Sequence, residues 1–133
     1  MLHALVVEEG RRLRGCLVQV LADSGYVVAE APDARTALER VRQRRPDVII
    51  HGHITPMASE LLLARRLDPE LSGIALVMTF AQPELAEDAD VILGERFTLD
   101  DLLAALTRCR ERAHVGARRP ALAGRRGPDA PAR

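Results

Sequence analysis

Short apolar runs alternate with segments of helical period over the first 114 residues of this 133-residue chain. The runs lack the polar alternation of a half-exposed strand, which is typical of strands covered on both faces of a parallel sheet. Five such strands separated by helices and joined by right-handed crossovers predict a doubly wound α/β fold. The expected strands are ALVV at 4–7, YVVAEA at 26–31, DVII at 47–50, GIALVMT at 73–79 and DVIL at 90–93.

Residues that begin or end helices flank the segments of helical period. Asp and Thr cap helix N-termini, Gly adopts the left-handed conformation that ends a helix, and Pro cannot continue one. These signals predict helices over 11–24, 34–45, 58–68 and 99–113. The residues that carry them are Gly25, Asp33, Pro46 and a capping box of Thr98 with Asp101.

The apolar residues of these helices recur at three- and four-residue spacing, so each helix is expected to turn one stripe toward the sheet. The expected stripes are Leu13, Cys16, Leu17, Val20 and Leu21 in the first helix, Ala34, Ala37, Leu38 and Val41 in the second, and Leu102, Leu103, Leu106 and Cys109 in the last.

The connection between the fourth and fifth strands is short. Only about ten residues, FAQPELAEDA, lie there, and Pro83 falls among them. That length leaves room for one or two helical turns after the proline. We therefore expect a shortened fourth helix.

Composition divides the chain into one domain over 1–114 and a tail over 115–133. The domain holds 14 arginines against 18 acidic residues, whereas the tail holds five arginines and one aspartate. The tail is rich in Arg, Ala, Pro and Gly and has few large apolar residues, so it is expected to be disordered. Its basic charge suits an acidic partner or nucleic acid, although a tail that only keeps the protein soluble fits as well.

Several classes of protein are excluded by what the sequence lacks. No apolar run approaches the length of a membrane span, and the first ten residues carry two glutamates instead of the basic start of a signal peptide. Two free cysteines on expected helix stripes fit the cytoplasm. The chain contains no phosphate-cradling glycine loop, zinc-spaced cysteine pair or elbow serine, so no enzyme activity is expected.

The segment PDVIIHGHITP, residues 46–56, resembles the third strand and following loop of a bacterial response-regulator receiver domain. In that family the phosphorylated aspartate closes the third strand four residues before a loop proline, here Pro56. Gly52 stands at that position. The resemblance covers residues 3 to about 113 and implies a flavodoxin-like α/β/α fold with strand order 2-1-3-4-5, the order of the chemotaxis receiver.

The resemblance also assigns a site at the carboxyl ends of the strands. Glu8 and Glu9 take the place of the acidic pair that holds Mg²⁺, and because glutamate is one methylene longer than aspartate, magnesium binding is expected to be weak. Thr79 matches the hydroxyl residue after the fourth strand, and Phe80 follows where receivers have a small residue. Glu95, in GERFT at 94–98, replaces the lysine that neutralises the phosphoryl group.

The resemblance thus implies a degenerate phosphorylation pocket, formed by Glu8, Glu9, Gly52, Thr79 and Glu95. Without a nucleophile and a cation the chain is expected to be a stand-alone receiver module that is not phosphorylated and acts through protein contact. The expected partner is a histidine kinase or another receiver or regulator, and a homodimer is also open; no DNA-binding domain and no membrane contact are expected, and no cofactor is required.

An alternative hypothesis is a metal-binding regulatory domain. His51 and His53 flank Gly52, and residues two apart in a strand project to the same face. Two imidazoles with the carboxylates of Glu8 and Glu9 are a ligand set for a transition metal. The same histidines would equally well pack under a helix at the strand end.

Overall fold

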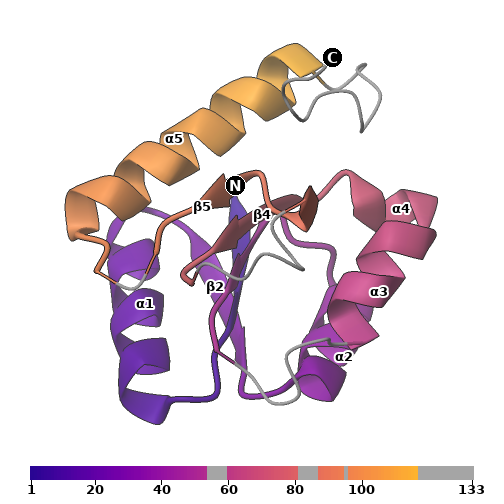
Figure 1. The fold of residues 1–133 in the computed structure, drawn as a ribbon, viewed down its shortest axis with the longest axis horizontal. Helices are drawn as coiled ribbons and strands as arrows, with labels where there is room; N and C mark the ends of the chain where they lie inside the picture. Colours follow the sequence, from indigo (N-terminus) through magenta and orange to yellow (C-terminus); the bar gives the residue numbers. More distant parts are fainter. Residues whose placement is uncertain (54–59, 81–86, 95, 117–133) are drawn as a thin grey trace.

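The structure, a computed structural model, describes residues 1–53, 60–80, 87–94 and 96–116. Its strands form one parallel sheet in the order β2-β1-β3-β4-β5, which confirms the predicted topology (Figure 1). The strands are β1 (His3–Val7), β2 (Val27–Ala31), β3 (Val48–His51), β4 (Ala75–Met78) and β5 (Val91–Ile92).

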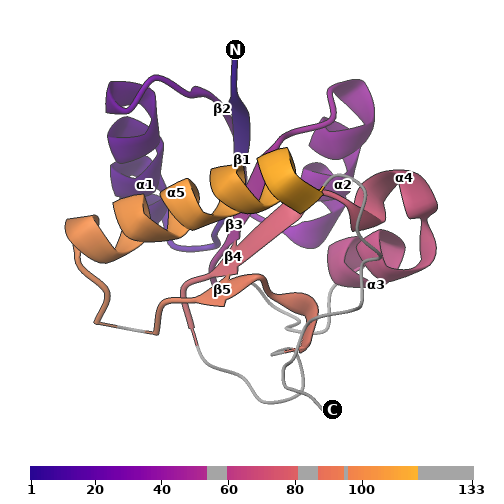
Figure 2. The same cartoon turned by 90° about the horizontal axis from the view of Figure 1, so that it is seen from above.

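Helices cover both faces of this sheet. Figures 1 and 2 show α1 and α5 on one side and α2, α3 and α4 on the other. The helices are α1 (Arg11–Asp23), α2 (Ala34–Gln43), α3 (Glu60–Leu67), α4 (Pro69–Ser72) and α5 (Leu99–Gly116). The label α4 thus belongs to one short turn directly after α3. The shortened helix expected between the fourth and fifth strands falls mostly on residues 81–86, outside the described residues, as do Glu95 and the tail from residue 117.

The sequence signals for helix ends act as expected. The side chain of Asp33 accepts a hydrogen bond from the backbone N–H of Thr36 at 2.7 Å, which lowers the pKa of this carboxyl. Thr98 and Asp101 bond each other's backbone N–H groups at 2.9 and 3.1 Å, so the capping box is confirmed. Gly25 has φ of +94°, the left-handed conformation expected of it. Helix α5 continues to Gly116, past its expected end at 113.

Alternate residues of the strands supply two cores, one on each face of the sheet, because successive side chains of a strand point to opposite faces. The core under α1 and α5 contains Ala4, Val6, Leu17, Leu21, Val48, Ile50, Val77, Leu102 and Leu106. The core under α2, α3 and α4 contains Leu5, Val7, Ala37, Val41, Ile49, Leu61, Leu71, Leu76 and Met78. Full burial of each larger aliphatic side chain stabilises the fold by roughly 1.5–3 kcal/mol.

The expected stripes of α2 and α5 are confirmed, but that of α1 was wrong in part. Leu13 is 40% exposed and Cys16 is exposed, while Leu17 and Leu21 are buried. The buried face begins instead at Arg14, whose guanidinium lies over the ends of β1 and β2 and donates to the carbonyl of Glu8 at 2.8 Å. A polar contact at the first turn therefore sets the rotation of this helix, which the apolar pattern could not reveal.

Arg65 joins three segments near the edge of the sheet formed by the two-residue strand β5. Its guanidinium donates to the carbonyl of Ile74 at 3.0 and 2.7 Å and to the carbonyl of Asp88 at 3.1 Å. It also lies 3.5 Å from the carboxylate of Asp90, which accepts from the backbone N–H of Leu76 at 2.8 Å. Arg65 thereby ties α3 to the start of β4 and to the segment that leads into the two-residue β5.

We expect Arg65→Lys to destabilise the protein by roughly 1–3 kcal/mol, because an ammonium cannot reproduce a fork of donors to several carbonyls. Arg66→Lys is the matched control on the same helix. Arg66 is 57% exposed and makes an ion pair with Asp88, a type of pair that contributes about 1 kcal/mol or less. Urea unfolding measures both variants; equal losses would show that Arg65 does not hold these segments together.

Candidate functional site

The carboxyl ends of β1, β3 and β4 meet at one edge of the sheet, where ligands bind in folds of this class. Backbone hydrogen bonds continue past the strands here: Gly52 N–H donates to the Val7 carbonyl at 2.6 Å, and Thr79 N–H donates to that of His51 at 3.1 Å. Glu9 N–H donates to the carbonyl of His53 at 2.7 Å. The loops after β1 and β3 are therefore joined directly, and Glu8, Gly52 and Thr79 lie at this edge of the sheet.

Glu8 turns its carboxylate into this junction. The residue is only 4% exposed. Oε1 accepts from the backbone N–H of His53 at 2.9 Å, and Oε2 accepts from that of Gly10 at 2.8 Å. A buried carboxylate is tolerated where it is hydrogen-bonded in this way. Glu8 thus bridges the loop after β1 and the loop after β3.

The Glu8 carboxylate occupies the space that a side chain at position 52 would need. A Cβ built on Gly52 would overlap Oε1 of Glu8 and lie 3.0 Å from its Cδ and 3.3 Å from its Cβ. Gly52 does not have a positive φ, so its backbone conformation would admit other residues. Any larger residue here would force the Glu8 side chain to move from this position.

Glu9 does not join Glu8 in this space. Its residue is exposed, whereas Glu8 is buried, so the expected acidic pair points two ways. Within the described ranges no three His, Cys, Asp or Glu side chains are grouped so that they could hold a metal ion. The residues present therefore do not reproduce the magnesium ligands of the resemblance, and Glu95 lies outside the described residues.

Thr79 and Phe80 follow β4 and are both buried, at 5% and 3% exposure. The Phe80 ring belongs to the core under α2 and α3. Its centroid lies 6.0 Å from that of His51 and 5.1 Å from that of His53. Phe80 therefore packs against the two histidines that sequence reasoning singled out as metal ligands.

His51 is fully buried, and neither ring nitrogen has a hydrogen-bond partner among the described residues. Desolvation by burial lowers the pKa of His51 to about 4, and the neighbouring backbone opposes this only in part. His53, in contrast, is exposed. Because the His51 ring is buried in the core and His53 is exposed, no observation favours the transition-metal hypothesis over simple packing of these histidines at the end of β3.

Two features of this site were not predicted from the sequence. One is the inward turn of Glu8 alone, which depends on β1 lying beside β3. The other is Arg14, whose guanidinium donates to the Glu8 carbonyl and pairs with Glu30 at 3.0 Å. In the sequence, only its position one helical turn before Leu17 and two turns before Leu21 indicated that Arg14 faces the sheet.

Comparison with known proteins gives relatives over about three quarters of the chain, although no family model matches. The chain is 29% identical over 109 residues to the response regulator MprA of Mycolicibacterium vanbaalenii, covering 77% of this chain and 47% of that protein. It is 31% identical over 99 residues to the transcriptional regulatory protein CseB of Streptomyces avermitilis, covering 74% and 40%. The chain thus spans less than half the length of these two relatives.

Solved structures agree with this result. The chemotaxis protein CheY4 of Vibrio cholerae superposes with a TM-score of 0.71 at 29% identity, over 82% of this chain and 98% of that one. A response regulator receiver domain protein from Clostridium thermocellum gives a TM-score of 0.72 over 86% and 98%; at 19% identity it supports the fold alone. No helix among the described residues is both long and apolar enough to cross a membrane.

The fit between Glu8 and Gly52 can be measured with a double-mutant cycle. We expect Gly52→Ala to destabilise the protein by roughly 1–3 kcal/mol, because the new methyl group displaces a buried carboxylate from two backbone N–H groups. In a Glu8→Ala background the same substitution should cost much less. Denaturant unfolding of the four proteins gives the coupling energy; a coupling near zero would show that the two positions do not share this space.

His51 should make stability depend on pH. Its folded pKa, about 4, lies below the unfolded value near 6.5, so the unfolded state binds the proton first and stability falls as pH drops from 6.5 toward 4. The expected loss is about 2 kcal/mol between pH 7 and pH 5. Urea unfolding at both pH values should show this loss in wild type and in His53→Leu, which alters an exposed ring, but not in His51→Leu. An unchanged loss in His51→Leu would assign it to other groups.

Proposed function

We infer that this chain, a homologue of the response regulators with the fold of their receiver domain, serves two-component signalling without being phosphorylated itself and acts through contact with another signalling protein. The observation that carries the proposal is the junction after β3: Gly52 offers no nucleophile, and the carboxylate of Glu8 fills the adjoining space.

Glu8 is a poor substitute for the missing acceptor. An acceptor carboxylate must present a free oxygen to the phosphodonor, but both oxygens of Glu8 accept backbone hydrogen bonds. The residue is also only 4% exposed to solvent. Phosphorylation of Glu8 would require the two loops to separate first. We therefore assign this carboxylate a structural role.

The charges of the chain support the same proposal. Phosphoryl transfer depends largely on cations placed around the moving group. All nineteen basic residues are arginines, so no lysine can stand where receivers place theirs. By the resemblance Glu95 takes that position, which reverses the sign of the charge.

A receiver that is not phosphorylated would need another way to set its conformation. Phosphorylation shifts an equilibrium between two states that already exist. Here Glu8 holds the loops after β1 and β3 in one arrangement from within. We propose that a partner, such as a histidine kinase, another receiver or a second copy of the chain, reads this fixed arrangement in the cytoplasm.

Incubation with radiolabelled acetyl phosphate tests the proposal. We expect no acid-labile, hydroxylamine-sensitive label on wild type under conditions that label a receiver with the usual aspartate. Glu8→Gln, which keeps the size of the side chain and removes its nucleophilic oxygen, should be equally unlabelled. Label on wild type that disappears in Glu8→Gln would identify Glu8 as an acceptor and overturn the proposal.

A further inference from the structure

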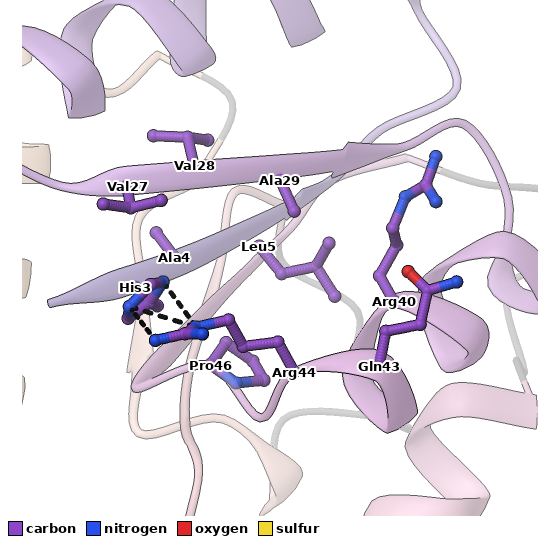
Figure 3. Close-up of a pocket in the computed structure, with 10 residues that line it drawn as sticks. All are labelled: His3, Ala4, Leu5, Val27, Val28, Ala29, Arg40, Gln43, Arg44 and Pro46. Atoms are coloured by element: carbon purple, nitrogen blue, oxygen red, sulfur yellow. Dashed lines mark hydrogen bonds between the residues drawn. The ribbon is translucent and has the colours of Figure 1, made fainter.

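A second recess lies at the opposite end of the sheet from the candidate site. It is a cavity of about 120 Å³ between the amino-terminal halves of β1 and β2 and the carboxyl-terminal half of α2 (Figure 3). This is close to the roughly 150 Å³ of a cavity that holds benzene. The recess is therefore large enough for one apolar side chain.

Its floor is apolar. Leu5 of β1, Val27 and Ala29 of β2 and Pro46 line it, and Val27 is 43% exposed although it is a large hydrophobic residue. The recess exists because α2 ends at Gln43 and the chain turns away at Pro46, so on this face of the sheet α2 stops short of the first residues of β1 and β2. An apolar side chain that entered it would cover Val27.

Arginines stand at the rim. Figure 3 shows Arg40 and Arg44 on α2 and its C-terminal extension, with the Arg44 guanidinium directed at His3. The nearest nitrogens of Arg44 and His3 are 2.9 Å apart. The Arg40 Nε donates to the carbonyl of Glu30 at 3.4 Å, a long bond that leaves its guanidinium exposed to solvent.

These arginines belong to a local concentration of positive charge. Residues 34–45 contain five arginines and one glutamate, whereas the rest of the first 114 residues contain nine arginines and seventeen acidic residues. Residues 34–45 thus carry a net positive charge, while the rest of the first 114 residues is negative in sum. A surface of this kind attracts and orients a partner of negative charge.

The recess opens beside an unpaired edge of the sheet. Within the described residues β2 pairs only with β1. The Val27 N–H donates inward to the Leu2 carbonyl at 2.9 Å, and the Ala31 carbonyl accepts from Glu8. Because these directions alternate along a strand, the N–H groups of Val28 and Glu30 point outward. An edge of this kind can pair with an extended peptide.

We propose that the edge of β2 and this recess bind an extended acidic peptide segment of a partner protein. The peptide backbone accepts hydrogen bonds from the N–H groups of Val28 and Glu30, one apolar side chain enters the recess over Val27, and flanking carboxylates meet Arg40 and Arg44. A nucleic acid fits less well because no Phe, Tyr or Trp lines the recess to serve as a stacking platform for a base. This surface is remote from Gly52, so the inference stands apart from the phosphorylation proposal.

The probe is a fluorescein-labelled nonapeptide with a central leucine and three or four acidic residues on each side, titrated with the full chain and followed by anisotropy. We expect binding that weakens roughly tenfold or more in Arg40→Glu/Arg44→Glu and less in Arg40→Gln/Arg44→Gln. The matched control is Arg42→Glu, a neighbouring exposed arginine outside the recess, which should retain nearly all the affinity. A peptide with serine for leucine should bind more weakly.

Amide chemical shifts locate the bound peptide, and we expect the largest changes at Val28 and Glu30. Three results would overturn the proposal: no binding at millimolar peptide, an equal loss in Arg42→Glu, or equal affinity of the serine peptide. Either of the latter two results would show that the acidic peptide is attracted by the overall positive charge of this surface and not bound in the recess. Competition by a single-stranded oligonucleotide at equal charge and lower concentration would instead identify a nucleic-acid surface. Melting curves of the variants confirm that each is folded.

Discussion

The carboxylate of Glu8, hydrogen-bonded to the backbone N–H groups of Gly10 and His53, is the contact on which the functional end of this domain depends. It draws the loops after β1 and β3 together at the edge where folds of this class bind ligands. The contact needs an empty position at 52, and glycine supplies it.

The alternation of strands with helices and most helix ends could be predicted from the sequence because their causes are local, whereas the strand order followed only from the resemblance to receiver domains. Continuous apolar runs, a capping aspartate at 33 and a capping box at Thr98 act on neighbouring residues only. The rotation of α1 could not be predicted, since Arg14 is held by the Glu8 carbonyl and by Glu30, partners that the chain brings near only after folding.

Part of the candidate site could likewise be predicted from the sequence, and part could not. The resemblance to receiver domains, with its spacing to Pro56, identifies Gly52 as the position that lacks a nucleophile, and the histidines on either side stand in the sequence itself. That Glu8 turns inward while Glu9 stays exposed depends on the pairing of two strands more than forty residues apart in the chain. The same holds for His51, whose ring is buried beside Phe80 with no hydrogen-bond partner among the described residues, and for the recess beside α2, for which the sequence contains no motif.

The shared volume of Glu8 and Gly52 also constrains how such a pocket can change. A single replacement at position 52 crowds two side chains into one space, and a single truncation at position 8 leaves the space without either. We therefore expect substitutions at positions 8 and 52 to depend on each other, because a side chain at position 52 is easier to accommodate once the side chain at position 8 has been shortened.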